Sequence, residues 1–95
     1  PSLTPDYFPN VTERTDGSFL VDGMMPIDEF ADRFESETAH LHHEDFATIS
    51  GLLLDRFGGI PKPGESVIID DYDIEIVDMD GARIDKILVK NIKPD

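Results

Sequence analysis

Carboxylates are concentrated in the C-terminal part of the sequence, and carboxylate oxygens are the ligands that Mg²⁺ and Ca²⁺ prefer in proteins. The acidic residues of this part are Asp70, Asp71, Asp73, Glu75, Asp78, Asp80 and Asp85. Those nearest the two acidic turns, around Asp71 and Asp80, are the candidate metal ligands: Asp71, Asp73, Asp78 and Asp80. Because two or three carboxylates of this kind are weakly organised, such a site should bind only in the ~0.1 to 1 mM range.

A purely structural interpretation explains the same carboxylates. Asp73 and Glu75 alternate with Ile74 and Ile76, as expected where one side of a strand faces solvent and the other faces a core. The segment 78–80 with its following glycine is not a calcium loop, because the glycine comes too early and the closing glutamate is missing. The segment is typical of a hairpin turn.

Histidines and acids also occur together in the polar segment 35–45, which contains His40, His42, His43, Glu44 and Asp45. Imidazole and carboxylate groups could bind a transition metal. Their spacing matches no established ligand pattern, and residues i and i+2 of a helix do not face each other. The sequence therefore favours a solvated loop over a metal site.

The segment 58–64, Gly-Gly-Ile-Pro-Lys-Pro-Gly, has the backbone freedom and the single cation that a phosphate site could use. It lacks the G-x-G-x-x-G pattern and follows a predicted helix instead of opening one. A helix stop that directs the next strand explains each glycine and proline without a ligand. No cysteine is present, and no serine has a histidine at a motif-defined distance, so we expect no enzyme.

Length and charge limit the classes of protein. The chain has 95 residues, enough for one core, and a net charge of -13, which would repel nucleic acids and anionic membranes. No apolar run approaches the ~20 residues that span a bilayer, so we expect no membrane insertion. Residues 1–10, with three prolines, predict a linker or arm before a domain over 11–95. Because the chain starts at Pro1, we expect a fragment of a longer protein.

Two helices are predicted. Pro26 suits the first position of one, whose apolar stripe is Ile27, Phe30, Ala31 and Phe34. Thr48 suits the N-cap of the other, and Gly58 its left-handed end; its buried face is formed by Ile49, Leu52, Leu53 and Phe57.

Five strands are predicted around these helices. A hairpin joins 11–14 to 18–22 through Asp16-Gly17, which would supply the positive φ angles of a tight turn, and a meander covers 66–70, 72–79 and 82–89. Ile84 is out of phase with Ile87 and Val89, which predicts a β-bulge near Asp85 and Lys86. The predicted fold class is α+β, an antiparallel sheet with two helices packed on it.

Several motifs in order resemble the CorC/HlyC transporter-associated domain over about 11–89. They are the segments 16–23, 26–30, 48–52, 58–64 and 77–87. The resemblance implies a regulatory domain on the cytoplasmic side of the bacterial inner membrane, with a CBS-domain pair and a membrane domain in the same hemolysin-like or magnesium and cobalt transport protein. It also implies a fold similar to a subdomain of FAD-binding enzymes of the vanillyl-alcohol oxidase type. Segment 35–45 matches nothing in the family.

Three functions follow as expectations: a non-catalytic regulatory domain, a weak Mg²⁺ or Ca²⁺ module, or, by fold analogy alone, a flavin or adenine-nucleotide module. A homodimer is also considered, because an open sheet edge must be covered or charged. Lys86 and Lys90 on the last strand would charge such an edge.

Overall fold

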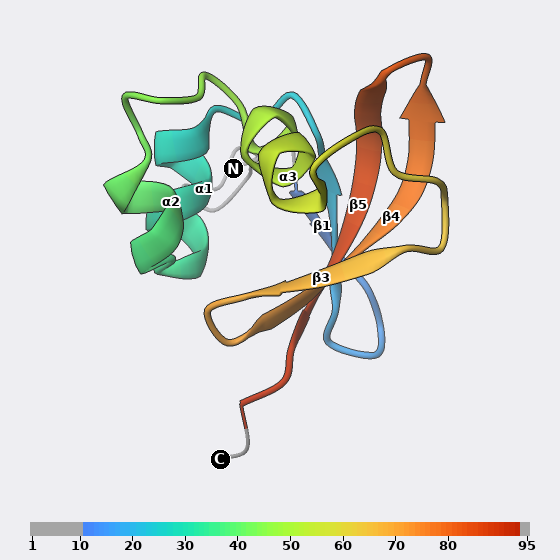
Figure 1. The fold of residues 1–95 in the computed structure, drawn as a ribbon. Helices are drawn as coiled ribbons and strands as arrows, with labels where there is room; N and C mark the ends of the chain where they lie inside the picture. Colours follow the sequence, from blue (N-terminus) through green and yellow to red (C-terminus); the bar gives the residue numbers. More distant parts are fainter. Residues whose placement is uncertain (1–10, 94–95) are drawn as a thin grey trace, which may run out of the picture.

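The computed structural model describes residues 11–93, which form one antiparallel sheet with helices on one of its faces (Figure 1). The strands are β1 (Val11–Glu13), β2 (Phe19–Asp22), β3 (Ser66–Ile69), β4 (Tyr72–Asp80) and β5 (Arg83–Asn91). The helices are α1 (Ile27–Phe34), α2 (Glu37–Leu41) and α3 (Ile49–Phe57). The predicted α+β class is confirmed, whereas the arm predicted for 1–10 lies outside the described residues.

The predicted hairpin and meander join into a single sheet of order β1-β2-β5-β4-β3, because β2 pairs with β5. Val21 lies opposite Ile87, and Ile87 lies opposite Ile76, so one row of apolar side chains crosses the middle of the sheet. The last strand is therefore central. The prediction that Lys86 and Lys90 charge an exposed edge was wrong, since the edge strands are β1 and β3.

Helices α1 and α3 have the predicted apolar faces. The stripe of α1 is buried, although Pro26 is the residue before the helix and not its first residue. Thr48 Oγ1 accepts a hydrogen bond from the Gly51 amide at the start of α3, and Gly58 ends that helix with φ of 71°. Ile49, Leu52 and Leu53 are fully buried against the sheet, and Phe57 is half-buried.

A third helix, α2, was not predicted. Segment 35–45 was expected to be a solvated loop, but Ser36 caps a five-residue helix by accepting a hydrogen bond from the Ala39 amide at 3.1 Å. Ala39 is completely buried, and Glu35 has the left-handed φ of 51° that separates α1 from α2. A polar segment thus becomes helical through its cap and one buried methyl group, which gives no apolar periodicity to detect.

The predicted β-bulge is confirmed. Asp78 pairs with Lys86 and Met79 pairs with Ile84, so Asp85 is skipped in the β4–β5 ladder. Ile84, like Ile87 and Val89, is fully buried, as the apolar pattern required. A second irregularity, at Val77 on β4, was not predicted.

The N-terminal hairpin differs from its prediction in one detail. Only Gly17 has a positive φ, of 88°, and the connection between β1 and β2 covers residues 14–18. Asp16 acts through its side chain, which accepts hydrogen bonds from the Ser18 amide at 3.0 Å and the Ser18 hydroxyl at 2.6 Å. These two bonds outweigh a small desolvation effect and lower the pKa of Asp16.

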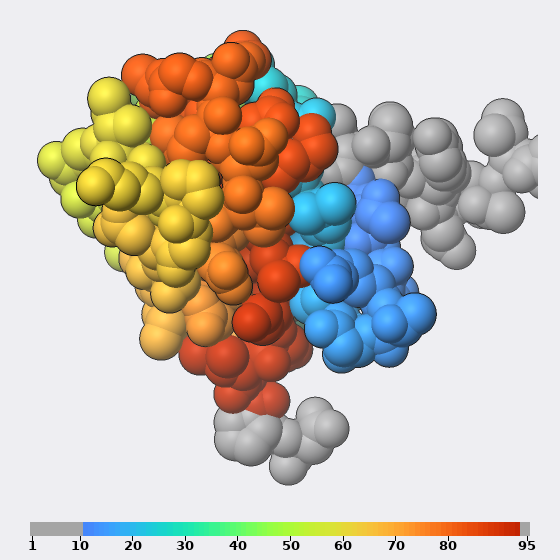
Figure 2. Space-filling model, turned by 90° about the vertical axis from the view of Figure 1, so that its right-hand side faces the viewer, coloured from blue at the N-terminus to red at the C-terminus, as the bar shows by residue number. Residues whose placement is uncertain are grey.

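The sheet face opposite the helices is turned toward the viewer in Figure 2. Side chains on this face alternate with those of the core and include Leu20, Glu75 and Leu88, which occupy one cross-strand row. The three helices of the described chain all lie on the other face of the sheet (Figure 1). Within residues 11–93 the sheet therefore has one face covered by helices and one face without a helix, the usual arrangement for antiparallel sheets, and on the second face Leu88 is nevertheless buried.

Candidate functional site

The four candidate metal ligands are distributed between the two ends of β4. Asp71 lies in the β3–β4 turn and Asp73 follows it, whereas Asp78 and Asp80 lie near the β4–β5 turn. Asp78 lies five positions after Asp73 on the same strand, which corresponds to roughly 16 Å at the rise of a strand. The structure therefore brings the four carboxylates together only as two separate pairs.

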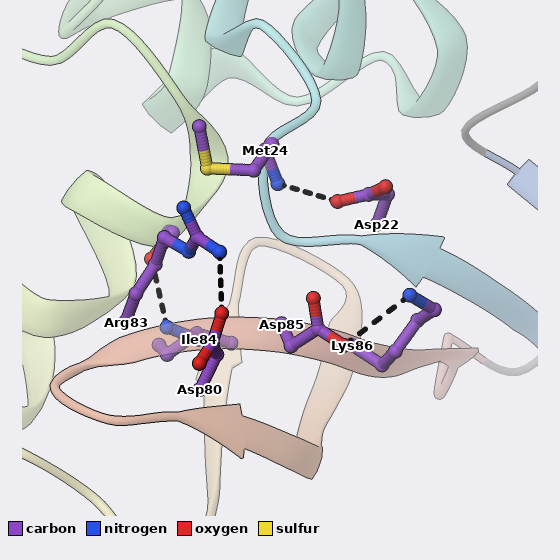
Figure 3. A network of polar contacts seen from close by, with 8 residues as sticks. Asp22, Met24, Asp80, Arg83, Ile84, Asp85 and Lys86 are labelled. Carbon is purple, nitrogen blue, oxygen red and sulfur yellow. Dashed lines mark hydrogen bonds and ion pairs between the residues drawn. The ribbon is translucent and has the colours of Figure 1, made fainter.

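Local cations neutralise part of this acidity. Arg83 Nη2 lies 2.6 Å from Asp80 Oδ2 across the β4–β5 turn (Figure 3). Lys86 lies opposite Asp78 in the ladder, but its Nζ is 3.4 Å from Asp85 Oδ2. Lys90 lies opposite Asp73, but its Nζ is 3.8 Å from Glu75 Oε1. Oδ1 of Asp73 is buried and has no hydrogen-bond partner in the described part of the chain. Within residues 11–93 no group of three or more histidine or acidic side chains could together hold a metal ion.

The histidines lie in and after α2 and make mainly local contacts. His42 Nδ1 and Asp45 Oδ2 are 2.8 Å apart, and His43 Nδ1 lies 2.9 Å from the carbonyl oxygen of His40. The rings of His40 and His43 stack with their centroids 5.8 Å apart. His43 Nε2 also lies 3.6 Å from Glu44 Oε2, so one ring nitrogen of His42 and both of His43 have neighbours within the segment itself.

Asp70 connects two distant parts of the chain, although its side chain is exposed. Its Oδ2 accepts a hydrogen bond from the Ser36 hydroxyl at 2.6 Å, and its Oδ1 accepts one from the Thr38 hydroxyl at 2.8 Å. The Thr38 amide is a further donor to Oδ2, at 3.3 Å. We call this set of contacts the Asp70 clasp; it ties the N-terminus of α2 to the β3–β4 turn.

The Asp70 clasp was not predicted, although Asp70 was among the acidic residues of the region. Asp70 has a left-handed φ of 57°, a conformation that Asp and Asn tolerate better than most residues. Partial burial would raise its pKa, but the hydrogen bonds from Ser36 and Thr38 outweigh burial and lower the pKa. The clasp is therefore made by the ionised carboxylate.

We expect Asp70→Asn to destabilise the domain by about 0.5–1 kcal/mol at neutral pH, a range reduced for solvent exposure. Asparagine keeps the left-handed backbone and removes the charge. Because the folded pKa of Asp70 is lowered, its contribution is present above the unfolded pKa of about 3.9 and is lost as the pH falls through the folded pKa. Urea unfolding of both proteins from pH 7 to pH 3 should therefore show their free energies of unfolding converging in acid.

Asp71→Asn is the matched control for this prediction. Asp71 is the exposed neighbour of Asp70 and has no role in the clasp, so its replacement should change stability by less than ~0.5 kcal/mol. Equal effects of the two substitutions, or a difference that stays constant with pH, would show that the clasp does not depend on the Asp70 charge.

A second polar junction holds α3 against the bulge in β5. Gly23 donates its amide to the carbonyl oxygen of Asp85 at 2.8 Å and accepts a hydrogen bond from the Ser50 amide at 2.9 Å. The Ile84 amide donates to Ser50 Oγ at 3.2 Å, one of the dashed contacts in Figure 3. The bulge thus frees backbone groups that Gly23 and Ser50 satisfy.

The buried serines have structural partners. Ser18, Ser36 and Ser50 bond to Asp16, to Asp70 and to the Ile84 amide, respectively. Within residues 11–93 none of these three hydroxyls is hydrogen-bonded to a histidine, so they form no serine–histidine pair of the kind that nucleophilic catalysis uses.

Segment 58–64 connects α3 to β3, and its backbone hydrogen bonds fix where β3 begins. Gly64, with φ of 98°, donates its amide to Ile76 O, and the Ile76 amide donates to Glu65 O, each at 2.8 Å. This two-against-one pairing starts β3 on its course beside β4. The Lys62 amide donates to the Glu65 carboxylate at 2.8 Å, so an acidic side chain already uses a donor that a phosphate would need.

The fold and these polar junctions define a small α+β domain with an acidic surface and, within residues 11–93, one sheet face without a helix. The chain belongs to the CorC_HlyC family, the transporter associated domain, whose model matches residues 12–93. No helix within residues 11–93 has the length and apolar composition needed to cross a membrane.

Curated relatives are much longer than this chain. A UPF0053 protein of Synechocystis is 42% identical over 92% of this chain, which corresponds to 20% of that relative. A UPF0053 inner membrane protein of Escherichia coli is 33% identical over 98% of the chain and 21% of its own length. A polyamine export protein of Haemophilus influenzae is 32% identical over 87% of the chain and 19% of its own length. The chain thus spans about one fifth of these relatives.

A solved structure of the same family contains divalent metals. It is the transporter associated domain of a Xylella fastidiosa hemolysin in complex with Mg²⁺ and Mn²⁺, and it is 39% identical to this chain. The match has a TM-score of 0.77 and covers 88% of this chain and 99% of the Xylella chain. The similarity therefore extends over the whole of that domain.

Proposed function

We propose that this chain is a non-catalytic regulatory domain of a bacterial membrane transport protein. The family match over residues 12–93, in a chain spanning about one fifth of its relatives, carries the proposal. The domain would lie on the cytoplasmic side of the inner membrane, against a CBS-domain pair of the same protein. There it would modulate the passage of a cationic solute.

The described structure supports this role through what its polar residues do. The Asp70 clasp and the Gly23–Ser50 junction use the buried hydroxyls to join secondary-structure elements. A net charge of -13 on 95 residues favours contact with a basic surface and opposes contact with anionic lipid headgroups. An acidic module of this kind is suited to docking against a basic surface of another protein domain.

The proposal can be tested by deleting residues 11–93 from the full-length protein in which this chain occurs. The proteins would be assayed in vesicles with Mg²⁺, Co²⁺ and a polyamine as separate solutes. We expect transport to persist in the deleted protein and its dependence on cytoplasmic ligand concentration to change. Identical rates and identical concentration dependence with and without the domain would refute a regulatory role.

Direct binding of a divalent cation is the second candidate, and the Mg²⁺ and Mn²⁺ complex of the Xylella domain favours it. Because Asp71 and Asp73 are distant from Asp78 and Asp80, a site would use one pair or the other. We predict saturable Mg²⁺ binding in the ~0.1 to 1 mM range by calorimetry at physiological salt.

Paired substitutions locate the predicted site. Replacing Asp71 and Asp73 by asparagine tests one end of β4, and replacing Asp78 and Asp80 tests the other. Binding should weaken at least tenfold in one double variant and remain unchanged in the other. A flat calorimetric titration of the unmodified chain would eliminate this candidate.

A further inference from the structure

Strand β3 forms one edge of the sheet, and among the described strands it is paired only with β4. Hydrogen-bonded and non-bonded pairs alternate along an antiparallel ladder. Ile76 exchanges bonds with the Gly64–Glu65 segment, so the next bonded pairs are Val67 with Ile74 and Ile69 with Tyr72. The backbone N–H and C=O groups of the two intervening residues, Ser66 and Ile68, are therefore directed away from the sheet.

Within its four residues, β3 lacks several of the devices that usually prevent another strand from pairing, although the strand is short and the two-against-one pairing at Gly64 and Glu65 precedes it. Natural edge strands carry charged residues, proline or a bulge. The strand Ser66–Ile69 contains no proline and no charge, and its four residues pair with β4 without a register shift. The side chain of Ile68 is 60% exposed. In Figure 2 the amber segment that contains β3 lies along one side of the molecule, opposite the blue N-terminal hairpin.

Acidic residues surround the edge. Glu65 precedes the strand, and Asp70 and Asp71 follow it, all three being exposed. On the adjacent strand Glu75 lies opposite Ser66, and Asp73 lies opposite Ile68. Lys90 Nζ approaches Glu75 at 3.8 Å and neutralises part of this charge.

The acidic charge around β3 also indicates what kind of strand could pair with this edge. A second copy paired along β3 would bring the same carboxylates against each other, and each copy carries a net charge of -13. A basic segment would instead place its cations beside these acids, and opposite charges on neighbouring strands stabilise pairing. A basic partner is the complementary occupant.

We infer that the β3 edge is a docking site for an extended segment of a partner protein in which apolar residues alternate with lysine or arginine. The segment adds to the sheet as a further strand, bonded to the backbone of Ser66 and Ile68. Its apolar side chains cover Ile68, and its cations lie near Glu65, Asp71 and Asp73. The inference rests on the proposed regulatory role and names the surface through which the domain makes contact.

The test uses a short fluorescein-labelled peptide of alternating valine and lysine, with a valine–glutamate peptide as its charge control. Fluorescence anisotropy should show saturable binding of the basic peptide to the 95-residue chain and none of the acidic peptide. Amide NMR should place the largest shifts at Ser66 and Ile68. Ile68→Pro removes an outward donor without removing a bond to β4, and we expect about tenfold weaker binding.

Two further variants keep the test decisive if the proline variant folds poorly. Ile68→Thr retains the amide and a β-branched side chain, so it should bind within about threefold of the unmodified chain. Ile68→Lys retains the amide but adds a charge that repels the peptide, so it should bind several-fold more weakly. Circular dichroism would establish that each variant is folded.

Several results would overturn the inference: no saturable binding, equal binding of the acidic peptide, equal binding by Ile68→Lys and Ile68→Thr, or amide shifts at another surface. Self-association that Ile68→Lys abolishes would assign the edge to a second copy and would also overturn it. These results leave the regulatory role standing if deletion of the domain still alters transport, so the two proposals fail separately.

Discussion

Gly23→Ala is expected to destabilise the domain by about 3 kcal/mol or more, which removes much of the stability of a domain of this size. Gly23 is buried, and a Cβ atom at this position would collide with the carbonyl oxygen of Ile84. That oxygen belongs to β5 beside the Asp85 bulge and cannot rotate away as a flexible side chain could. Urea unfolding followed by circular dichroism measures the loss.

The damage should extend beyond the collision itself. Displacing Gly23 would lengthen its hydrogen bond to Asp85 and the bond it accepts from Ser50, so α3 would separate from β5. Gly59→Ala is the matched control, because nothing lies within 4 Å of a Cβ atom placed there and its φ is not positive. The control should change stability by less than ~0.5 kcal/mol. Similar effects of the two substitutions would refute a specific steric role for Gly23.

Secondary-structure features could be predicted from the sequence where burial of one face imposes a periodic pattern of apolar residues or where a cap depends on a few neighbouring residues. The α1 stripe, the Thr48 cap and the left-handed Gly58 all occur where predicted, because each depends on one or two neighbouring residues. The Asp85 bulge was predictable for the same reason, since Ile84 and Ile87 reach one core only if the ladder skips a residue.

The order of the strands could not be obtained in that way. Apolar alternation in β2 and β5 shows that each strand has a buried face but does not show that they pair with each other. The pairing of Val21 with Ile87 crosses most of the chain and depends on how α1 and α3 fill the connection. Consequently the last strand was misplaced at an edge, and the open edge of β3 became apparent only in the structure.

The candidate site was predicted as a set of residue types but not as a geometry. The acids around β4 were identified from composition, and the strand then separates Asp71 and Asp73 from Asp78 and Asp80. Asp70 was passed over as a member of a charge run, because its partners Ser36 and Thr38 are more than thirty residues away. A serine that caps a short polar helix and also reaches a distant carboxylate leaves no local periodic signal.

Phe34 lies at the centre of an aromatic cluster that joins α1 to the sheet. Its ring contacts Phe19 of β2 and Tyr72 of β4 edge-on, with centroid distances of 5.4 and 5.5 Å, and it contacts Phe30 at 4.7 Å. The guanidinium of Arg33 lies over the Phe19 ring, with Cζ 4.8 Å from its centroid. Edge-on aromatic contacts stabilise beyond the area that they bury, so this residue couples the helical layer to two strands that are not adjacent.

Phe34→Ala is therefore expected to cost about 3–5 kcal/mol, because it leaves a cavity between the layers and removes the ring contacts to Phe19 and Tyr72. The measurement is the urea midpoint, together with the near-ultraviolet circular dichroism of the remaining aromatic residues. Phe34→Leu fills most of the cavity and should cost less than about 2 kcal/mol. The difference between the free energies of unfolding of the two variants measures the cost of the cavity. If alanine and leucine destabilise equally, the ring geometry and not the filled volume holds α1 on the sheet.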